Sequence, residues 1–137
     1  MMSPLENLHT AIGELAYAVA RADGTIQKEE RQKFHDIVMA EIRSKDYNFD
    51  ISEIIFKILD KDKIVDTETS YNWAIKEIRM NSHYLSPELK AKAIRVMEKI
   101  AEAFPPVTPK ETSLLKRFRE DIEPINGDPV YYQSGNQ

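Results

Sequence analysis

Hydrophobic residues recur every three or four positions along most of the chain. The first run contains Leu8, Ile12, Leu15 and Val19, which is the spacing of one helical face. Alanines at positions 11, 18 and 22 widen this face to most of the helix circumference. The pattern therefore predicts a central helix that begins near Leu5 and is buried on nearly all sides.

Five further helical patterns follow, and several begin with clear N-terminal signals. Ser3 and Thr108 are each followed by a proline and, three positions on, by Glu6 and Glu111, which is the capping-box arrangement. The later predicted helices cover residues 27–42, 50–59, 67–81, 86–104 and 108–122. Trp73 is expected beside the buried face of the fourth helix, and no segment alternates as a strand does. The sequence therefore predicts an all-α, compact bundle of about six or seven helices.

The chain also contains an internal echo at a spacing of 81 residues. This shift places Leu15, Val19, Ala22, Ile26, Glu30 and Phe34 against Val96, Ile100, Ala103, Val107, Glu111 and Leu115. It predicts two pseudo-repeated helix-turn-helix units at residues 5–43 and 87–122. The first corner reads Asp23-Gly24-Thr25, whereas the second reads Phe104-Pro105-Pro106. Because the second unit turns without this aspartate, Asp23 is expected to serve another purpose.

Length and composition predict one helical domain followed by a tail. At 137 residues the chain suits a single core, which we assign to residues 1–122. Residues 123–137 have two prolines and no helical period, but Tyr131 and Tyr132 lie in a short apolar island. The tail is expected either to pack on its own domain or to present these tyrosines to a partner.

Several classes of function lack their characteristic residues. There is no cysteine, which excludes disulfides and thiolate chemistry, and only four glycines, with no phosphate-binding loop or serine elbow. His9, His35 and His83 have no metal-ligand spacing and are expected at surface or half-buried positions. No secretory signal and no apolar run of about 20 residues is present. We therefore predict a soluble, cytoplasmic protein that is not an enzyme.

The net charge of −4 conceals a basic stretch. Ten basic residues and five acidic residues lie between Lys76 and Arg119. The stretch is a candidate positive face for an acidic partner, anionic lipid or nucleic acid, and Lys92, Arg95 and Lys99 are its candidate partner-binding residues. A solvated helix exterior is the simpler interpretation. The sequence isoelectric point of about 5.4 and the lack of an RNA-binding motif argue against nucleic acid.

The first corner has a partial likeness to a calcium loop. Residues 23–30 match the second half of an EF-hand, but Val19 and Arg21 stand where its first ligands belong, so a full EF-hand is excluded. A looser divalent-cation site formed by Asp23 and Glu30 is one interpretation. In the other, Glu30 caps the following helix by accepting a hydrogen bond from the backbone of Gln27. The residues alone leave both open.

The same corner also resembles a family signature. A hydrophobic helix followed by Ala22-Asp23-Gly24, then Ile26 and Glu30, is similar to the repeated motif of TerB-like tellurite-resistance proteins. The resemblance implies about seven helices, no recognised catalytic activity, and a role in tellurite resistance or related stress responses. It also implies protein partners, some of them membrane proteins, and hence a place at the periphery of the inner membrane. The second unit departs from the motif because it lacks the Asp-Gly pair.

Overall fold

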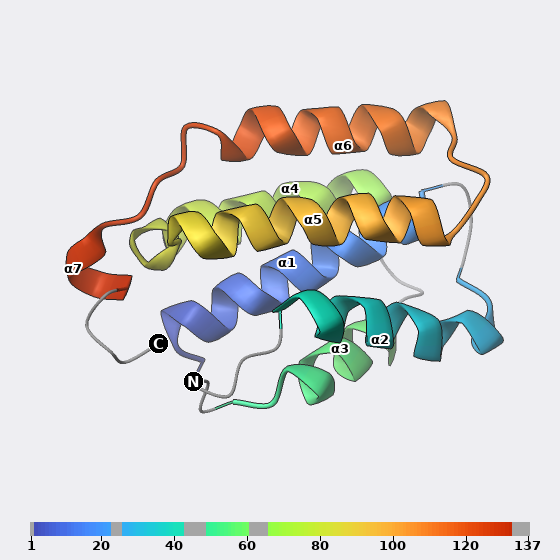
Figure 1. The fold of residues 1–137 in the computed structure, drawn as a ribbon, viewed down its shortest axis with the longest axis horizontal. Coiled ribbons are helices and arrows are strands. Elements are labelled where there is room, and N and C mark those ends of the chain that lie inside the picture. Colours follow the sequence, from blue (N-terminus) through green and yellow to red (C-terminus); the bar gives the residue numbers. More distant parts are fainter. Residues whose placement is uncertain (1, 23–25, 43–48, 61–65, 133–137) are drawn as a thin grey trace.

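A computed structural model of the chain describes residues 2–22, 26–42, 49–60 and 66–132 (Figure 1). Within these ranges the chain forms seven α-helices and two short 3-10 helices, with no strand. The helices are α1 (Pro4–Ala20), η1 (Lys28–Glu30), α2 (Arg31–Ile42), α3 (Ile51–Asp60), α4 (Thr67–Met80), η2 (Ser82–Tyr84), α5 (Pro87–Ala103), α6 (Pro109–Ile122) and α7 (Pro129–Tyr132). The predicted all-α bundle is confirmed.

A short polar side chain caps the start of α1, α4, α5 and α6. Ser3 accepts a hydrogen bond from the Glu6 amide at 3.1 Å, and the Glu6 carboxylate accepts one from the Ser3 amide at 3.5 Å. At the starts of α4, α5 and α6, the side chains of Asp66, Ser86 and Thr108 each accept a hydrogen bond from the backbone amide three residues further on. Each such cap contributes about 1 kcal/mol. Local sequence therefore determines where these helices begin.

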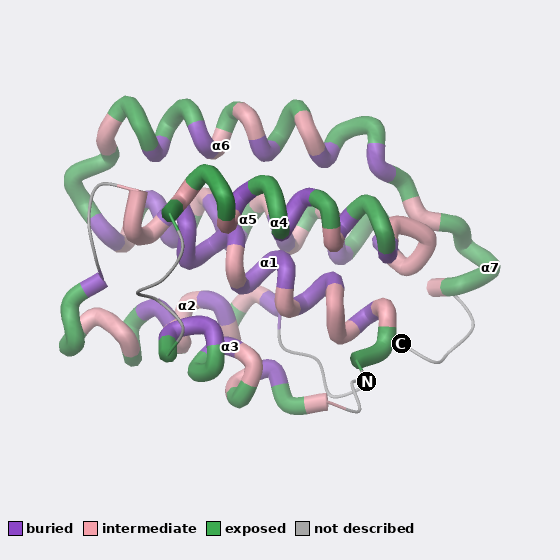
Figure 2. Tube along the Cα trace, turned by 180° about the vertical axis from the view of Figure 1, so that it is seen from behind, coloured by how far each residue is buried: buried purple, intermediate pink, exposed green. Residues whose placement is uncertain are grey.

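Helix α1 is the centre of the bundle (Figure 2). It packs most extensively against α4 and also contacts α5, α3, α2 and α6. Leu8, Ile12 and Ala16 are fully buried. Gly13 faces α3, where an added Cβ would lie 2.8 Å from Cδ1 of Ile58. The absence of a side chain at Gly13 thus lets α3 pack closely against the central helix.

The two predicted helix-turn-helix units are α1 with α2 and α5 with α6, and α2 packs on α5. Their corresponding positions are not equally buried. Ile26 is 8% exposed, but Val107, its counterpart in the echo, is 53% exposed. Ile37, Ile54 and Leu115 are only partly buried because they lie at the borders of their apolar stripes. The sequence echo therefore predicts the order of the helices correctly, but it does not predict how deeply corresponding residues are buried.

The described part of the tail packs on its own domain. The Gly127 amide donates to the carbonyl of Leu85 at 3.1 Å, and the Asp128 amide donates to that of His83 at 3.0 Å. A Cβ on Gly127 would lie 2.5 Å from the Leu85 carbonyl oxygen, so only glycine fits this approach. Ile125 is buried against the core. The division of the chain at residue 122 stays a prediction.

Candidate functional site

The first corner places Glu30 in a cap. Gln27 is the N-cap of η1, and its amide donates to Oε1 of Glu30 at 2.9 Å. Asp23, Gly24 and Thr25 lie outside the described residues. Among the residues that are described, no cluster of three or more histidine, cysteine, aspartate or glutamate side chains is placed to hold a metal ion. A cation site at this corner would therefore depend on Asp23.

The second corner contains a buried carboxylate that sequence reasoning missed. Glu111 corresponds to Glu30 in the echo, but it is only 2% exposed, whereas Glu30 is half-buried. Its amide donates to Oγ1 of Thr108 at 3.3 Å. The capping motif predicted this bond but carried no signal of burial, which results from the packing of α6 on the bundle. The candidate carboxylate site was predicted at the first corner, whereas the second corner contains the more deeply buried of the two glutamates in the capping motif.

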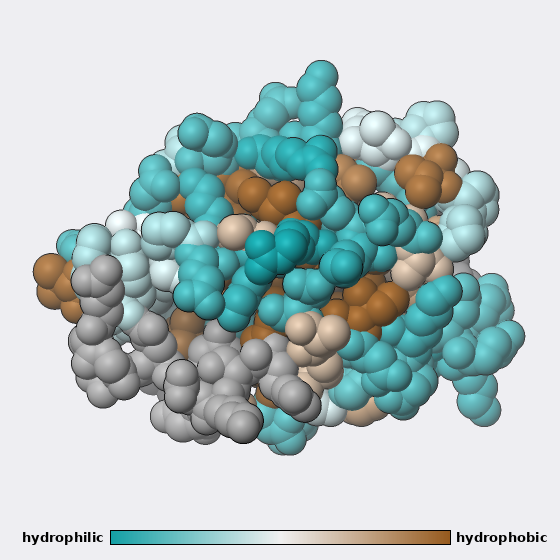
Figure 3. Space-filling view, in the orientation of Figure 1, coloured by the Kyte–Doolittle hydropathy of each residue, from teal (hydrophilic) through white to brown (hydrophobic). Residues whose placement is uncertain are grey.

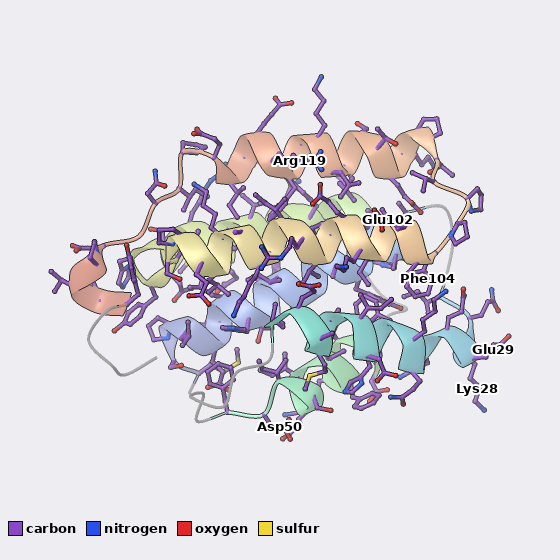
Figure 4. All side chains as sticks on the ribbon, in the orientation of Figure 1. Lys28, Glu29, Asp50, Glu102, Phe104 and Arg119 are labelled. Carbon is purple, nitrogen blue, oxygen red and sulfur yellow. The ribbon has the colours of Figure 1, made fainter. Side chains whose placement is uncertain are left out.

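The two corners lie at the same end of the bundle, where α2 meets α5. Nζ of Lys33 donates to the carbonyl of Ala103 at 2.5 Å and lies 5.0 Å from the ring centroid of Phe104. A cation at this position satisfies a carbonyl at the end of α5 and complements the helix dipole. Phe104 lies between α5 and α2, while Lys28 and Glu29 point outward (Figure 4). This contact joins the two helix-turn-helix units.

A cleft of about 810 Å³ opens between the start of α4, the N-terminal part of α6 and Ala22, which lies two residues past the end of α1. Two acidic and two basic residues line it, and Arg117 makes the most contacts among them. The guanidinium donates to Glu68 at 2.7 and 2.9 Å and to Asn72 at 2.8 Å, and it lies 4.2 Å from the ring centroid of Tyr71. The lining residues are Ala22, Asp66, Thr67, Glu68, Pro109, Lys110, Ser113, Leu114 and Arg117.

The polar groups beside this cleft form hydrogen bonds and ion pairs with one another. The hydrogen bond from Arg117 lowers the pKa of Glu68 and raises the pKa of Arg117. The Tyr71 hydroxyl donates to Asp121 at 2.7 Å, and burial together with that carboxylate raises the pKa of Tyr71. These bonds attach α4 to α6. The cleft therefore has a rigid wall made of paired charges.

The three candidate cations on α5 do not act as one group. Arg95 and Lys99 both approach Glu41 of α2, at 3.4 and 3.8 Å, and remain 50% and 55% exposed. Lys92 instead pairs with Glu88 of its own helix at 3.3 Å and is 21% exposed. Hydrophilic side chains cover most of the face on which α5 lies (Figure 3). Two of the three predicted residues thus share one half-buried carboxylate.

The two candidate tyrosines lie beside the tail contact. Tyr131 is 41% exposed, and its ring packs edge-on against His83 with 4.8 Å between centroids. Tyr132 lines a second cleft of about 380 Å³ between the tail and α5. Nζ of Lys90 donates to the carbonyls of Glu123 and Ile125 at 2.7 and 2.9 Å, and to the Asn126 side chain at 3.1 Å. Lys90 therefore fastens the tail.

The expectation of surface or half-buried histidines was wrong for His9, which is 1% exposed. Its Nδ1–H donates to the carbonyl of Leu5 at 2.8 Å, and its ring lies edge-on to Phe49. Burial lowers the pKa of His9 to about 4, with a smaller lowering by Lys92, while the bond to Leu5 acts in the opposite direction. Position 9 lies within the apolar face of α1, and this spacing was the signal that could have predicted the burial of His9.

His35 connects α2 to α3. Its Nε2 lies 2.6 Å from Oγ of Ser52, its Nδ1 lies 3.0 Å from Oδ1 of Asp36, and its ring stacks on Phe56. The hydrogen bond from His35 is the main reason that the pKa of Asp36 is lowered. Asp36 is 63% exposed to solvent. Sequence spacing did not suggest this set of contacts, because it forms only when α3 packs on α2.

A comparison with family models matches residues 9–123 to the Tellurite resistance protein TerB family. The chain belongs to the TerB family. The match covers the second helix-turn-helix unit and all of the first except the start of α1, and it confirms the resemblance seen at the first corner. Neither the search of curated proteins nor that of solved structures found a match. In the described part of this TerB-family chain, every helix is too short or too polar to cross a membrane.

Proposed function

We propose that this chain is a non-enzymatic TerB-type module that works in tellurite resistance or a related stress response by holding protein partners. The match of residues 9–123 to the TerB family carries this proposal. The link to tellurite comes from the family as a whole. In the larger cleft the charged groups around Arg117 and Glu68 bond to one another and join α4 to α6, so we assign them a structural role rather than a catalytic one.

Two surfaces are proposed to meet protein partners. Arg95 and Lys99 are half exposed around Glu41, so a partner carboxylate can join the two cations without dismantling the bundle. Tyr131 and Tyr132 form the second surface, where an exposed aromatic edge lies beside the apolar cleft. The partners are proposed to include membrane proteins, with the chain in the cytoplasm at the periphery of the inner membrane. Nucleic acid is not among the proposed partners.

Capture of partners from the native cell tests the first surface. We expect Arg95→Glu with Lys99→Glu to lose proteins that the unaltered chain retains, because both substitutions repel an acidic partner. Lys28→Glu with Lys57→Glu is the matched control, since it makes the same charge change at exposed positions outside both proposed surfaces. Equal retention by all three proteins would remove this surface from the proposal.

Growth on tellurite tests the physiological role. Deleting the gene should lower survival on tellurite or under related oxidative stress, and the unaltered chain should restore it. The variant with Arg95→Glu and Lys99→Glu should restore it less well than the charge-matched control. A deletion strain that survives every such stress as well as its parent would contradict the proposed role.

A divalent cation at Asp23 and Glu30 is the second candidate function. The observation that favours it is the position of Glu30 at the corner. One oxygen of its carboxylate, Oε1, accepts a hydrogen bond from the Gln27 amide, and the other oxygen takes no part in that bond. Added Ca²⁺, Mg²⁺, Mn²⁺ or Zn²⁺ should then raise the melting temperature, and Asp23→Asn or Glu30→Gln should abolish the rise. Glu29→Gln is the control for charge. A melting temperature that stays the same with each of the four ions would eliminate this candidate.

A further inference from the structure

The outward face of α4 exposes two large apolar side chains. Trp73 is 71% exposed and Met80 is 62% exposed, and Lys76 and Arg79 are exposed beside them. We call these four residues the α4 face. The opposite side of the helix is buried in the core through Tyr71, Ala74, Ile75 and Ile78. Helix α4 lies behind α5 in Figure 1 and is seen from its own side in Figure 2.

The two cations of the α4 face lack the carboxylate partners that seven other basic residues have within the described ranges. Arg95 and Lys99 share Glu41, and Arg117 is held by Glu68. Lys76 and Arg79, by contrast, form no ion pair within the described ranges. The only acid between residues 72 and 80 is Glu77, which is half-buried. The α4 face therefore combines exposed apolar groups with unneutralised positive charge.

The combination of apolar and positively charged groups limits the kinds of partner that can bind the α4 face. A second copy of the chain placed symmetrically on the α4 face would bring four cations together, which is unfavourable. A peptide with an apolar anchor needs a concave pocket, but neither of the clefts described above is lined by residues of this face. A planar anionic surface fits both properties. Tryptophan prefers the boundary between lipid headgroups and acyl chains, and lysine and arginine are attracted to anionic headgroups.

We propose that the α4 face docks on the surface of an anionic phospholipid bilayer. Trp73 and Met80 enter the headgroup boundary, and Lys76 and Arg79 contact lipid phosphates. The association is peripheral, weak and sensitive to salt, because only two free cations and two apolar side chains take part. This inference does not depend on the proposed protein partners, which engage α5 and the tail.

Trp73 reports directly on this contact because it is the only tryptophan in the chain. The full chain is titrated at low ionic strength with phosphatidylglycerol vesicles and, separately, with phosphatidylcholine vesicles. We expect a blue shift of tryptophan emission and protection from acrylamide quenching with phosphatidylglycerol alone. Raising the salt to about 0.5 M should reverse both changes, since the Debye length becomes shorter than the contact region.

Paired variants separate this surface from general charge. Lys76→Gln with Arg79→Gln should reduce partition into phosphatidylglycerol vesicles about 30-fold. Arg95→Gln with Lys99→Gln removes the same two charges from α5 and should leave partition within about twofold of the unaltered chain. Trp73→Ala, followed by vesicle co-sedimentation, should also weaken binding. Circular dichroism checks that each variant keeps its helices.

Three outcomes would overturn the proposal. The first is tryptophan emission that does not respond to phosphatidylglycerol. The second is an equal loss of binding in the α4 and α5 variants, which would indicate net charge alone. The third is a change in tryptophan emission that is equally large with phosphatidylcholine, which would show that Lys76 and Arg79 do not bind anionic headgroups. Partners captured through α5 in the same preparations would be unaffected, so this failure is distinguishable from failure of the proposed function.

Discussion

Lowering the pH should destabilise the fold through His9. An unfolded chain binds a proton on this imidazole near its ordinary pKa of 6.5, but the buried ring does so only near pH 4. The unfolded state therefore binds more protons between these values, so stability falls as the pH drops from about 6.5 to about 4. A tenfold change in proton affinity is about 1.4 kcal/mol, which makes the full loss about 3 kcal/mol.

Urea unfolding of the unaltered chain and of His9→Phe measures this effect. Between about pH 7 and about pH 4.5 the unaltered chain should lose about 2.5 kcal/mol more than the variant, because phenylalanine cannot titrate. Surface carboxylates such as Asp66 and Glu68, whose pKa values are also lowered, contribute equally to both proteins and cancel. His83→Gln is the control, because it removes an imidazole that is only partly buried.

Comparing how the stability of the unaltered chain and of His9→Phe changes with pH tests the role of His9. Parallel curves for the unaltered chain and His9→Phe would refute the reasoning, even if phenylalanine changes the absolute stability. Titration of the imidazole by NMR gives a direct second reading. A His9 ring that titrates near its ordinary pKa of 6.5 in the folded protein would show that burial does not exclude its charged form.

Three further predictions concern close contacts. Gly127→Ala should cost about 1–3 kcal/mol and expose the tail to proteases, because its Cβ would meet the backbone oxygen of Leu85 at 2.5 Å. Gly13→Ala should cost less in urea unfolding, since the clash at 2.8 Å is with the end of the flexible Ile58 side chain and alanine favours the helix. Lys90→Met should free the tail from three oxygen acceptors at a cost of about 1–3 kcal/mol, visible as faster cleavage after residue 122 with α1–α6 intact.

The helices and their beginnings could be read from the sequence. Ser3, Ser86 and Thr108 cap the helices that their local sequence predicted, because a cap needs only residues within one turn. The apolar stripe of α1 likewise marked it as central, since a helix that is apolar on nearly all sides has to be surrounded. Family membership also followed from the short motif around Ala22 and Ile26.

Contacts between distant segments were decided by the tertiary structure alone. Glu30 and Glu111 have the same capping motif, but only Glu111 is buried, because burial depends on what packs over a helix start. Trp73 was expected beside the buried face of α4 and is nevertheless 71% exposed, since no element within the described ranges covers that side of the helix. Lys90 holds a tail that is more than 30 residues further along. Local pattern encodes the faces of helices, whereas the partner of each face depends on how all the helices pack together.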